Sequence, residues 1–288
     1  MCRIFGFRSV MQSQVHRSLV SADNAFMLQS ERHPDGWGVA YYVAQAPHVI
    51  KGASAAFGDQ LFKHVSGIVT SETVLAHLRK ATQGELSPIN THPFQYGHWV
   101  FAHNGNIEGF ADVRDDLLAR IPPVLRRFIL GSTDSEVIFY LILGKMAQRC
   151  ELHRPGFPLA AIAESVREAV AEISALVGPI CEDNAGPPHR TYLSFVLTNG
   201  LAMLAHQGGK ELHVSTHKRR CPDRDTCPHF APECERAAEN GFVSHLVLSS
   251  EPLHGDNVWE ELRPHEMIGV DARMQVQRFP PPAPGSAT

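Results

Sequence analysis

The chain of 288 residues lacks long hydrophobic runs, an excess of positive charge and a dense set of cysteines. No apolar stretch approaches the roughly 18 residues that a membrane-spanning helix needs, so we expect no membrane contact. Lys and Arg (26) are outnumbered by Asp and Glu (30), which argues against a nucleic-acid partner. Six cysteines are too few for a disulfide scaffold, and the N-terminus does not resemble a secretory signal. We therefore expect reduced thiols and a cytoplasmic protein.

Several common functional motifs are also missing. The chain contains neither G-x-G-x-x-G nor G-x-x-x-x-G-K-[ST], which removes the usual glycine-rich nucleotide loops. It contains neither H-E-x-x-H nor G-x-S-x-G, which removes the common zinc-protease and serine-hydrolase signatures. The composition, with 43% hydrophobic and 19% charged residues, is that of a globular protein with a core of normal size.

The order of predicted elements indicates the fold class. Short apolar runs bounded by Gly, Pro or Asn predict strands. The predicted strands span 2–8, 38–43, 73–78, 98–102, 192–198, 201–206, 212–216, 244–249 and 267–270. Between the early and late strands, a capping box at 133–136 opens one helix, and an amphipathic pattern predicts another over 158–177. Strands, then helices, then strands favour an α+β protein with antiparallel sheets and segregated helices.

No long linker divides the chain. We expect one domain over 1–275 and a Pro-rich, disordered tail over 276–288. Asn199-Gly200, between two predicted strands, predicts a hairpin turn.

Cys2 is the residue that says most about chemistry. Removal of Met1 would leave a thiol and a free α-amine on one residue, and the amine, with a pKa of about 7.7–8.0, can act as a base near neutral pH. The alternative is a buried cysteine that merely begins a strand.

Three further positions have both a chemical and a purely structural interpretation. Arg79 follows an apolar strand and its planar guanidinium suits a substrate carboxylate, but an ordinary salt-bridge arginine would look the same. Asn104-Gly105 is a hairpin-turn signal, and its side-chain amide and backbone N–H are also suitable oxyanion donors. Asp134 is favoured at a helix N-terminus by the dipole, and it could also receive a substrate ammonium group.

One local cluster is a weak candidate for a metal site. Cys221, Cys227, Cys234 and His229 lie within a short segment and carry ligand atoms suited to zinc. Their spacing is not the C-x₂-C of known zinc sites, and the segment is expected to be a surface loop.

Short motifs follow one another in a fixed order along the chain. They are MCRIFG at 1–6, DGWG at 35–38, HLRKAT at 77–82, NTHPF at 90–94, HNGN at 103–106 and STDSE at 132–136. With LTNG at 197–200 and SSEPL at 249–253, this order resembles the class II glutamine amidotransferases over residues 2–273. The late motifs look like the small stand-alone branch, which includes YafJ-type proteins and the ergothioneine-pathway γ-glutamyl hydrolase.

The resemblance implies a fold and a set of roles. The fold is the four-layer α/β/β/α sandwich of Ntn hydrolases, in which Cys2 attacks the γ-carbonyl of glutamine or another γ-glutamyl compound. The implied γ-glutamyl thioester is then hydrolysed to glutamate, with release of ammonia or an amine and without a metal or organic cofactor. The resemblance also implies that Arg79, with Thr82 beside it, binds the substrate α-carboxylate and that Asp134 binds the α-ammonium group. It implies that Asn104 and Gly105 form the oxyanion hole, and that Arg32 is a basic residue near the thiol.

The sequence departs from this family's pattern at two positions near the expected entrance. Lys80 stands where synthase-linked relatives carry tryptophan, and Gln83 where they carry histidine. The substrate is therefore expected to be a small γ-glutamyl molecule whose size can differ from that of glutamine. A separate synthase or acceptor subunit is the partner that the resemblance allows. The alternatives are a catalytically silent or metal-binding interaction protein on the same fold, and an amidase for other acyl amides.

Overall fold

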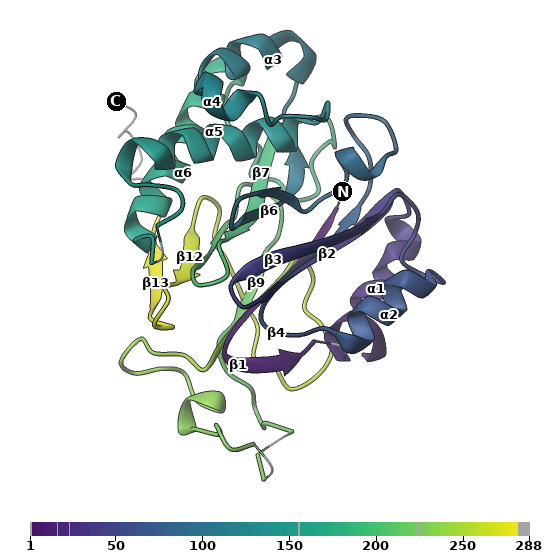
Figure 1. Cartoon of the computed structure of the whole chain (residues 1–288), viewed down its shortest axis with the longest axis vertical. Helices are drawn as coiled ribbons and strands as arrows, with labels where there is room; N and C mark the ends of the chain where they lie inside the picture. The colour runs from purple at the N-terminus through teal and green to yellow at the C-terminus, as the bar shows by residue number, and fades with distance from the viewer. Residues whose placement is uncertain are drawn as a thin grey trace.

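Two antiparallel β-sheets face each other in the middle of the molecule, and helices cover the outer face of each sheet (Figure 1). The computed structural model describes residues 2–15, 17–22, 24–154, 156–222, 224–225 and 227–281. The layer order is helix, sheet, sheet, helix. The expectation of an α+β, four-layer sandwich is confirmed.

The first sheet has seven strands. In spatial order they are β11 (Glu260–Glu261), β9 (His213–Ser215), β10 (His245–Ser249), β1 (Arg3–Gln14), β4 (Thr70–Arg79), β2 (Gly36–Val43) and β3 (Ala46–Gly52). Because side chains alternate along a strand, Ile4 and Leu75 point toward the second sheet while Phe5 and Ala76 pack beneath the helices of the first. Each face of this sheet is therefore buried.

The second sheet has six strands. In spatial order they are β13 (Val276–Phe279), β12 (Met267–Val270), β8 (Met203–His206), β7 (Tyr192–Thr198), β6 (Trp99–Asn106) and β5 (Phe94–Tyr96). The predicted hairpin at Asn199-Gly200 joins β7 to β8, with Thr198 opposite Met203. The expected tail boundary at 275 is wrong, because residues Val276–Phe279 form β13. This strand pairs with β12 and completes the edge of the sheet. Residues 282–288 of the predicted tail lie outside the described residues.

The helices divide between the two outer faces. On the first sheet lie α1 (Phe26–Gln29) and α2 (Gln60–Ile68), and on the second lie α3 (Phe110–Ala119), α4 (Pro123–Arg126), α5 (Asp134–Arg149) and α6 (Leu159–Val177). Short π- and 3₁₀-turns occupy Arg17–Ser21, Ser30–Arg32, Pro88–Asn90 and Pro232–Cys234. No helix in the described part of the chain is long and apolar enough to cross a lipid bilayer.

Helix α5 begins where the sequence predicts. The Thr133 hydroxyl accepts the N–H of Glu136 at 3.3 Å, which confirms the capping interaction. The Glu136 carboxylate does not close the box; it accepts the N–H groups of Leu130 (3.1 Å) and Gly131 (2.7 Å) instead. The first turn of α5, with Asp134 in it, is thus held from both sides and buried.

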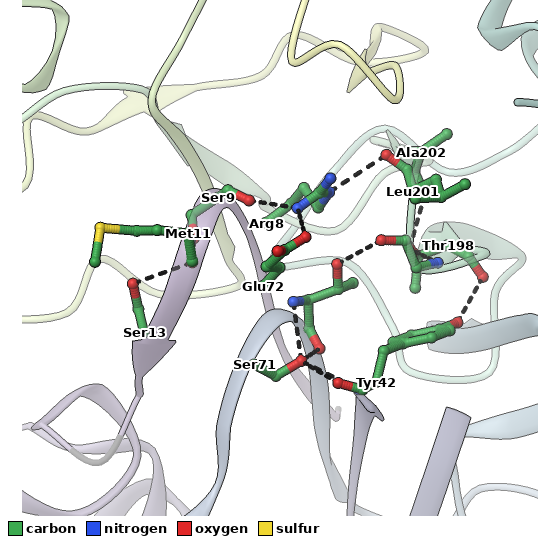
Figure 2. Close-up of polar contacts among 12 residues, drawn as sticks. Arg8, Ser9, Met11, Ser13, Tyr42, Ser71, Glu72, Thr198, Leu201 and Ala202 are labelled. Carbon is green, nitrogen blue, oxygen red and sulfur yellow. Dashed lines mark hydrogen bonds and ion pairs between the residues drawn. The ribbon is translucent and has the colours of Figure 1, made fainter. Parts of the chain in front are cut away.

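Buried polar contacts tie the two sheets together at one end of the sandwich (Figure 2). The Tyr42 hydroxyl donates to the carbonyl of His98 at 2.7 Å and lies 3.2 Å from that of Thr198. The Arg8 guanidinium donates to the carbonyl of Leu201 at 3.3 Å and pairs with Glu72 at 3.2 Å. These contacts lie well after the start of β1 and near the start of β4. The start of β1 and the end of β4 pair with each other at the opposite end of the sandwich.

Candidate active site

Cys2 lies at the end of the sandwich opposite the contacts of Figure 2. β1 and β4 pair with Arg3 opposite Leu78, and this register brings Cys2 beside Arg79 and Lys80. The N–H of Lys80 donates to the Cys2 thiol sulfur at 3.3 Å. The Cys2 side chain is only 8% exposed, and burial raises the pKa of its thiol. A nucleophilic role therefore requires a nearby base.

Arg79 ends β4 and is 2% exposed. Its guanidinium donates to three carbonyls of the loop that follows β4: those of Gln83 (2.8 Å), Gly84 (3.2 Å) and Glu85 (3.1 Å). Within the described chain no carboxylate lies at ion-pair distance from it. Burial lowers the pKa of the guanidinium below its ordinary value, yet the group stays charged at neutral pH. The charge is oriented but not neutralised by a partner, which suits it to a ligand carboxylate.

Asp134 is the first residue of α5 and is almost fully buried. One carboxylate oxygen accepts the N–H of Ile107 at 2.8 Å, and the other accepts the N–H of Ser135 at 2.8 Å. The contact with Ile107 ties the start of α5 to the end of β6. The negative charge of Asp134 acts to raise the pKa values of both Cys2 and Arg79, as expected for groups that share one site.

Asn104 and Gly105 lie inside β6, where they pair with Ser194 and Leu193 of β7. The hairpin-turn interpretation of this dipeptide is therefore wrong. The Asn104 side chain is buried, and its carbonyl oxygen has no hydrogen-bond partner among the described residues. A Cβ on Gly105 would come within 1.9 Å of the Tyr192 carbonyl oxygen, so only glycine fits this position.

Buried histidines join the thiol-bearing sheet to the sheet that carries Asn104. The His77 Nε2 lies 3.0 Å from the backbone carbonyl oxygen of His103, which connects β4 to β6. The His92 ring packs on that of His77 with centroids 4.1 Å apart, and it precedes a cis bond to Pro93. Burial lowers the pKa of His77 to about 3, so the ring is neutral at pH 7. Sequence reasoning assigned these histidines no positioning role, although the HLRKAT and NTHPF motifs contain them.

Arg32 and Thr82 lie at the edge of the site. Arg32 is 66% exposed, and its guanidinium lies 3.5 Å from the Glu251 carboxylate. Arg3 reaches the same carboxylate oxygen at 3.4 Å and also donates to the Cys2 carbonyl at 3.3 Å. Thr82 is exposed on the loop after β4. Arg3 and Glu251 were not among the predicted site residues, although each belongs to a motif that the sequence analysis singled out.

The cysteine-rich segment forms the bottom of the molecule in Figure 1, well separated in that view from the N-terminus. Cys221, Cys227, Cys234 and His229 line a cavity of about 640 Å³ beside the second half of β1. In the described part of the chain, no group of three or more His, Cys, Asp or Glu side chains is arranged to hold a metal ion. The segment takes no part in the site around Cys2.

Comparison with known proteins identifies the family. The model of the class II glutamine amidotransferases matches residues 1–282. YafJ of Escherichia coli (strain K12), named as a glutamine amidotransferase, is 28% identical over 246 residues, which are 81% of this chain and 84% of that protein. The gamma-glutamyl-hercynylcysteine sulfoxide hydrolase of Mycobacterium tuberculosis (strain CDC 1551) is 37% identical over 75 residues, 26% of this chain and 32% of that protein.

A solved structure supports the same fold. The glutamine aminotransferase class-II domain protein from Silicibacter pomeroyi superposes with a TM-score of 0.60 at 21% identity, covering 96% of this chain and 98% of that one. The order of motifs, the antiparallel double sheet and the match along almost the whole chain agree. This chain belongs to the class II glutamine amidotransferases.

Proposed function

We propose that the chain is a hydrolase of γ-glutamyl amide bonds, in glutamine or in another γ-glutamyl compound, with Cys2 as the nucleophile. The observation that carries the proposal is that the buried thiol of Cys2 lies within the electrostatic influence of Arg79, a cation without an ion-pair partner in the described chain, and of the Asp134 carboxylate. Arg79 complements an α-carboxylate and Asp134 an α-ammonium, and together they fit the head group of an α-amino acid. This pairing favours a γ-glutamyl substrate over other acyl amides.

The reaction follows from the groups present. Removal of Met1 would expose the α-amine of Cys2, which takes the thiol proton; the thiolate then attacks the γ-carbonyl carbon. The carbonyl electron pair moves to oxygen, where the Asn104 amide and the Gly105 N–H donate hydrogen bonds to the oxyanion. When this intermediate collapses, the C–N bond breaks and the departing amine takes the proton from the α-ammonium of Cys2.

The second half of the reaction regenerates the thiol. Water attacks the γ-glutamyl thioester while the α-amine accepts a proton from it, and the C–S bond breaks to release glutamate. The proton returns to the sulfur. Arg32 and Thr82, at the edge of the site, are assigned to the approach of the substrate rather than to the bond changes.

Two outcomes for the released amine are open to this chemistry. It can diffuse away, so that hydrolysis is the whole reaction, or ammonia can pass to an acceptor subunit that is a separate chain. The name of the M. tuberculosis relative favours hydrolysis, since that protein is named as a hydrolase of a γ-glutamyl compound.

The test is glutamate release from glutamine and from a panel of γ-glutamyl compounds, after mass spectrometry has established removal of Met1. Cys2→Ala is expected to abolish turnover, and labelling of the native protein by a glutamine-analogue electrophile is expected to map to Cys2. The matched control is Cys150→Ala, a partly buried cysteine at the end of α5, which should keep full activity. Turnover that persists in Cys2→Ala would refute the proposal. If the correctly processed protein shows no turnover and Cys2 is not labelled, the result would favour the alternative, a catalytically silent interaction protein.

A further inference from the structure

A row of three buried polar side chains leads from Asp134, at the start of α5, to His103 in β6. The Ser135 hydroxyl lies between them, 3.2 Å from one carboxylate oxygen of Asp134 and 2.9 Å from Nδ1 of His103. The other ring nitrogen of His103, Nε2, lies 2.9 Å from the backbone carbonyl oxygen of Tyr192. The Ser135 hydroxyl therefore has two possible acceptors and only one proton.

The carbonyl of Tyr192 decides which acceptor receives this proton. A carbonyl oxygen can only accept, so Nε2 of His103 carries a hydrogen. Burial lowers the pKa of His103 by more than the charge of Asp134 and the contact with Tyr192 raise it, so the ring is neutral at pH 7. In a neutral ring the second nitrogen is an acceptor, and Nδ1 therefore accepts the proton of the Ser135 hydroxyl.

The Asp134 carboxylate is thereby left with backbone donors alone. Its two oxygens accept the N–H groups of Ile107 and Ser135, each at 2.8 Å. Once the Ser135 hydroxyl points to His103, no other donor in the described chain contacts this carboxylate. If the hydroxyl turned the other way, it would add a third donor to the carboxylate and compete with a bound cation.

We infer that His103 is a positioning residue for substrate recognition: its Nδ1 holds the Ser135 hydroxyl away from Asp134 and so keeps the carboxylate free for the substrate α-ammonium group. The inference rests on the proposed function, in which Asp134 binds that group. His103 acts through Ser135 and takes no part in the bond changes.

The experiment measures how strongly the enzyme prefers a substrate that carries an α-ammonium group. It compares kcat/KM for the best γ-glutamyl compound of the panel with kcat/KM for the analogue in which hydrogen replaces that group; for glutamine this analogue is glutaramate. His103→Leu removes the acceptor, so the Ser135 hydroxyl is expected to turn to Asp134. The ratio of the two values should then fall about tenfold, the scale of one hydrogen bond to a charged group.

A second substitution separates this role from general damage to the fold. Ser135→Ala removes the hydroxyl, so it should restore the ratio in His103→Leu to within about threefold of native. The matched control is Ser165→Ala in α6, where a buried hydroxyl donates to the Ala161 carbonyl at 2.7 Å. Added to His103→Leu, this control should restore nothing, because truncation of a distant serine cannot free the Asp134 carboxylate.

The protonation of the His103 ring gives a readout that needs no turnover and no variant. Nitrogen NMR of the native protein at pH 7 is expected to show a neutral ring with its hydrogen on Nε2, as the Tyr192 carbonyl requires. A ring with its hydrogen on Nδ1, or an imidazolium, would overturn the inference. This measurement decides the question if His103→Leu does not fold.

The outcomes separate this inference from the proposed function. A ratio that is unchanged in His103→Leu, or that Ser135→Ala does not restore, would overturn the inference while Cys2-dependent turnover stands. A native protein that uses the analogue equally well would refute the role of Asp134 in the proposed function, and the inference would fail with it. The same holds if no γ-glutamyl compound is hydrolysed and Cys2 is not labelled.

Discussion

Truncation of the Asn104 side chain is expected to lower kcat strongly while it changes the free energy of unfolding little. In the oxyanion role, the amide N–H₂ donates to the charge that develops on the substrate oxygen, whereas its carbonyl oxygen has no partner within the described protein. Asn104→Ala therefore deletes a donor needed in the transition state and breaks no hydrogen bond of the described fold.

The expected magnitudes differ sharply. Loss of one oxyanion donor costs about 3–4 kcal/mol of transition-state stabilisation, which lowers kcat about 10²–10³-fold. The free energy of unfolding should change by no more than about 1 kcal/mol, because the small cavity is offset by the removal of a buried, unpartnered carbonyl oxygen.

Steady-state kinetics and urea denaturation measure the two quantities on one preparation. The control is Asn106→Ala on the same strand: its amide donates to the His189 carbonyl at 2.8 Å and its oxygen accepts from Gln83 at 3.1 Å. That variant should lose about 1–3 kcal/mol of stability. A kcat within tenfold of native in Asn104→Ala, or a loss of activity that only follows unfolding, would refute the reasoning.

Two predictions concern stability. Tyr42→Phe leaves the His98 and Thr198 carbonyls without their buried donor and should lower the free energy of unfolding by about 1–2 kcal/mol in urea denaturation, whereas a variant as stable as native would contradict this. Burial lowers the pKa of His77 to about 3 and that of His206 to about 4, so below about pH 6.5 the unfolded chain takes up protons that the folded chain does not. Stability is then complete above pH 6.5 and falls by up to about 2 kcal/mol per ring between pH 6.5 and 5; equal denaturation midpoints at pH 7 and 5 would count against it.

The same dipeptide shows where prediction from sequence ends. Asn199-Gly200 is a turn, as predicted, and Gly200 has a φ of 88°. Asn104-Gly105 is the same pair of residues, yet it lies within a strand, because the Tyr192 carbonyl passes where a side chain at 105 would be. Local propensity cannot distinguish the two, since the difference arises from a strand almost ninety residues away in the chain.

Elements that bury a long periodic face were predictable, and peripheral ones were not. The strand over 192–198 and the amphipathic helix now seen as α6 agree with their apolar patterns. By contrast α3 buries only Phe110 and Leu117, and α2 is only nine residues long, so neither carries a strong pattern. β3 is a partly exposed edge strand and was missed for the same reason.

The roles of the candidate site residues stay predictions, whereas the contacts around these residues come from the structure alone. Motif order pointed to Cys2, Arg79 and Asp134, and in the structure the charges of Arg79 and Asp134 act on the pKa of the Cys2 thiol. The pairing of Arg3 with Glu251 joins segments that are distant in the chain, so no local pattern predicts it. The contacts of Arg79 are local, but they are made to backbone carbonyls, which every residue type carries, so the sequence does not indicate them either.

The ion pair between Arg3 and Glu251 joins residues that are 248 positions apart in the chain. Next to this ion pair, β10 pairs with β1. During synthesis the segment that carries Cys2 emerges first, but the strand that flanks it is among the last to be made. Contacts of such large sequence separation form slowly, because a long loop must close before they stabilise anything. The entrance around Cys2 is therefore incomplete on a partly synthesised chain, and its final shape depends on the arrival of the C-terminal strands.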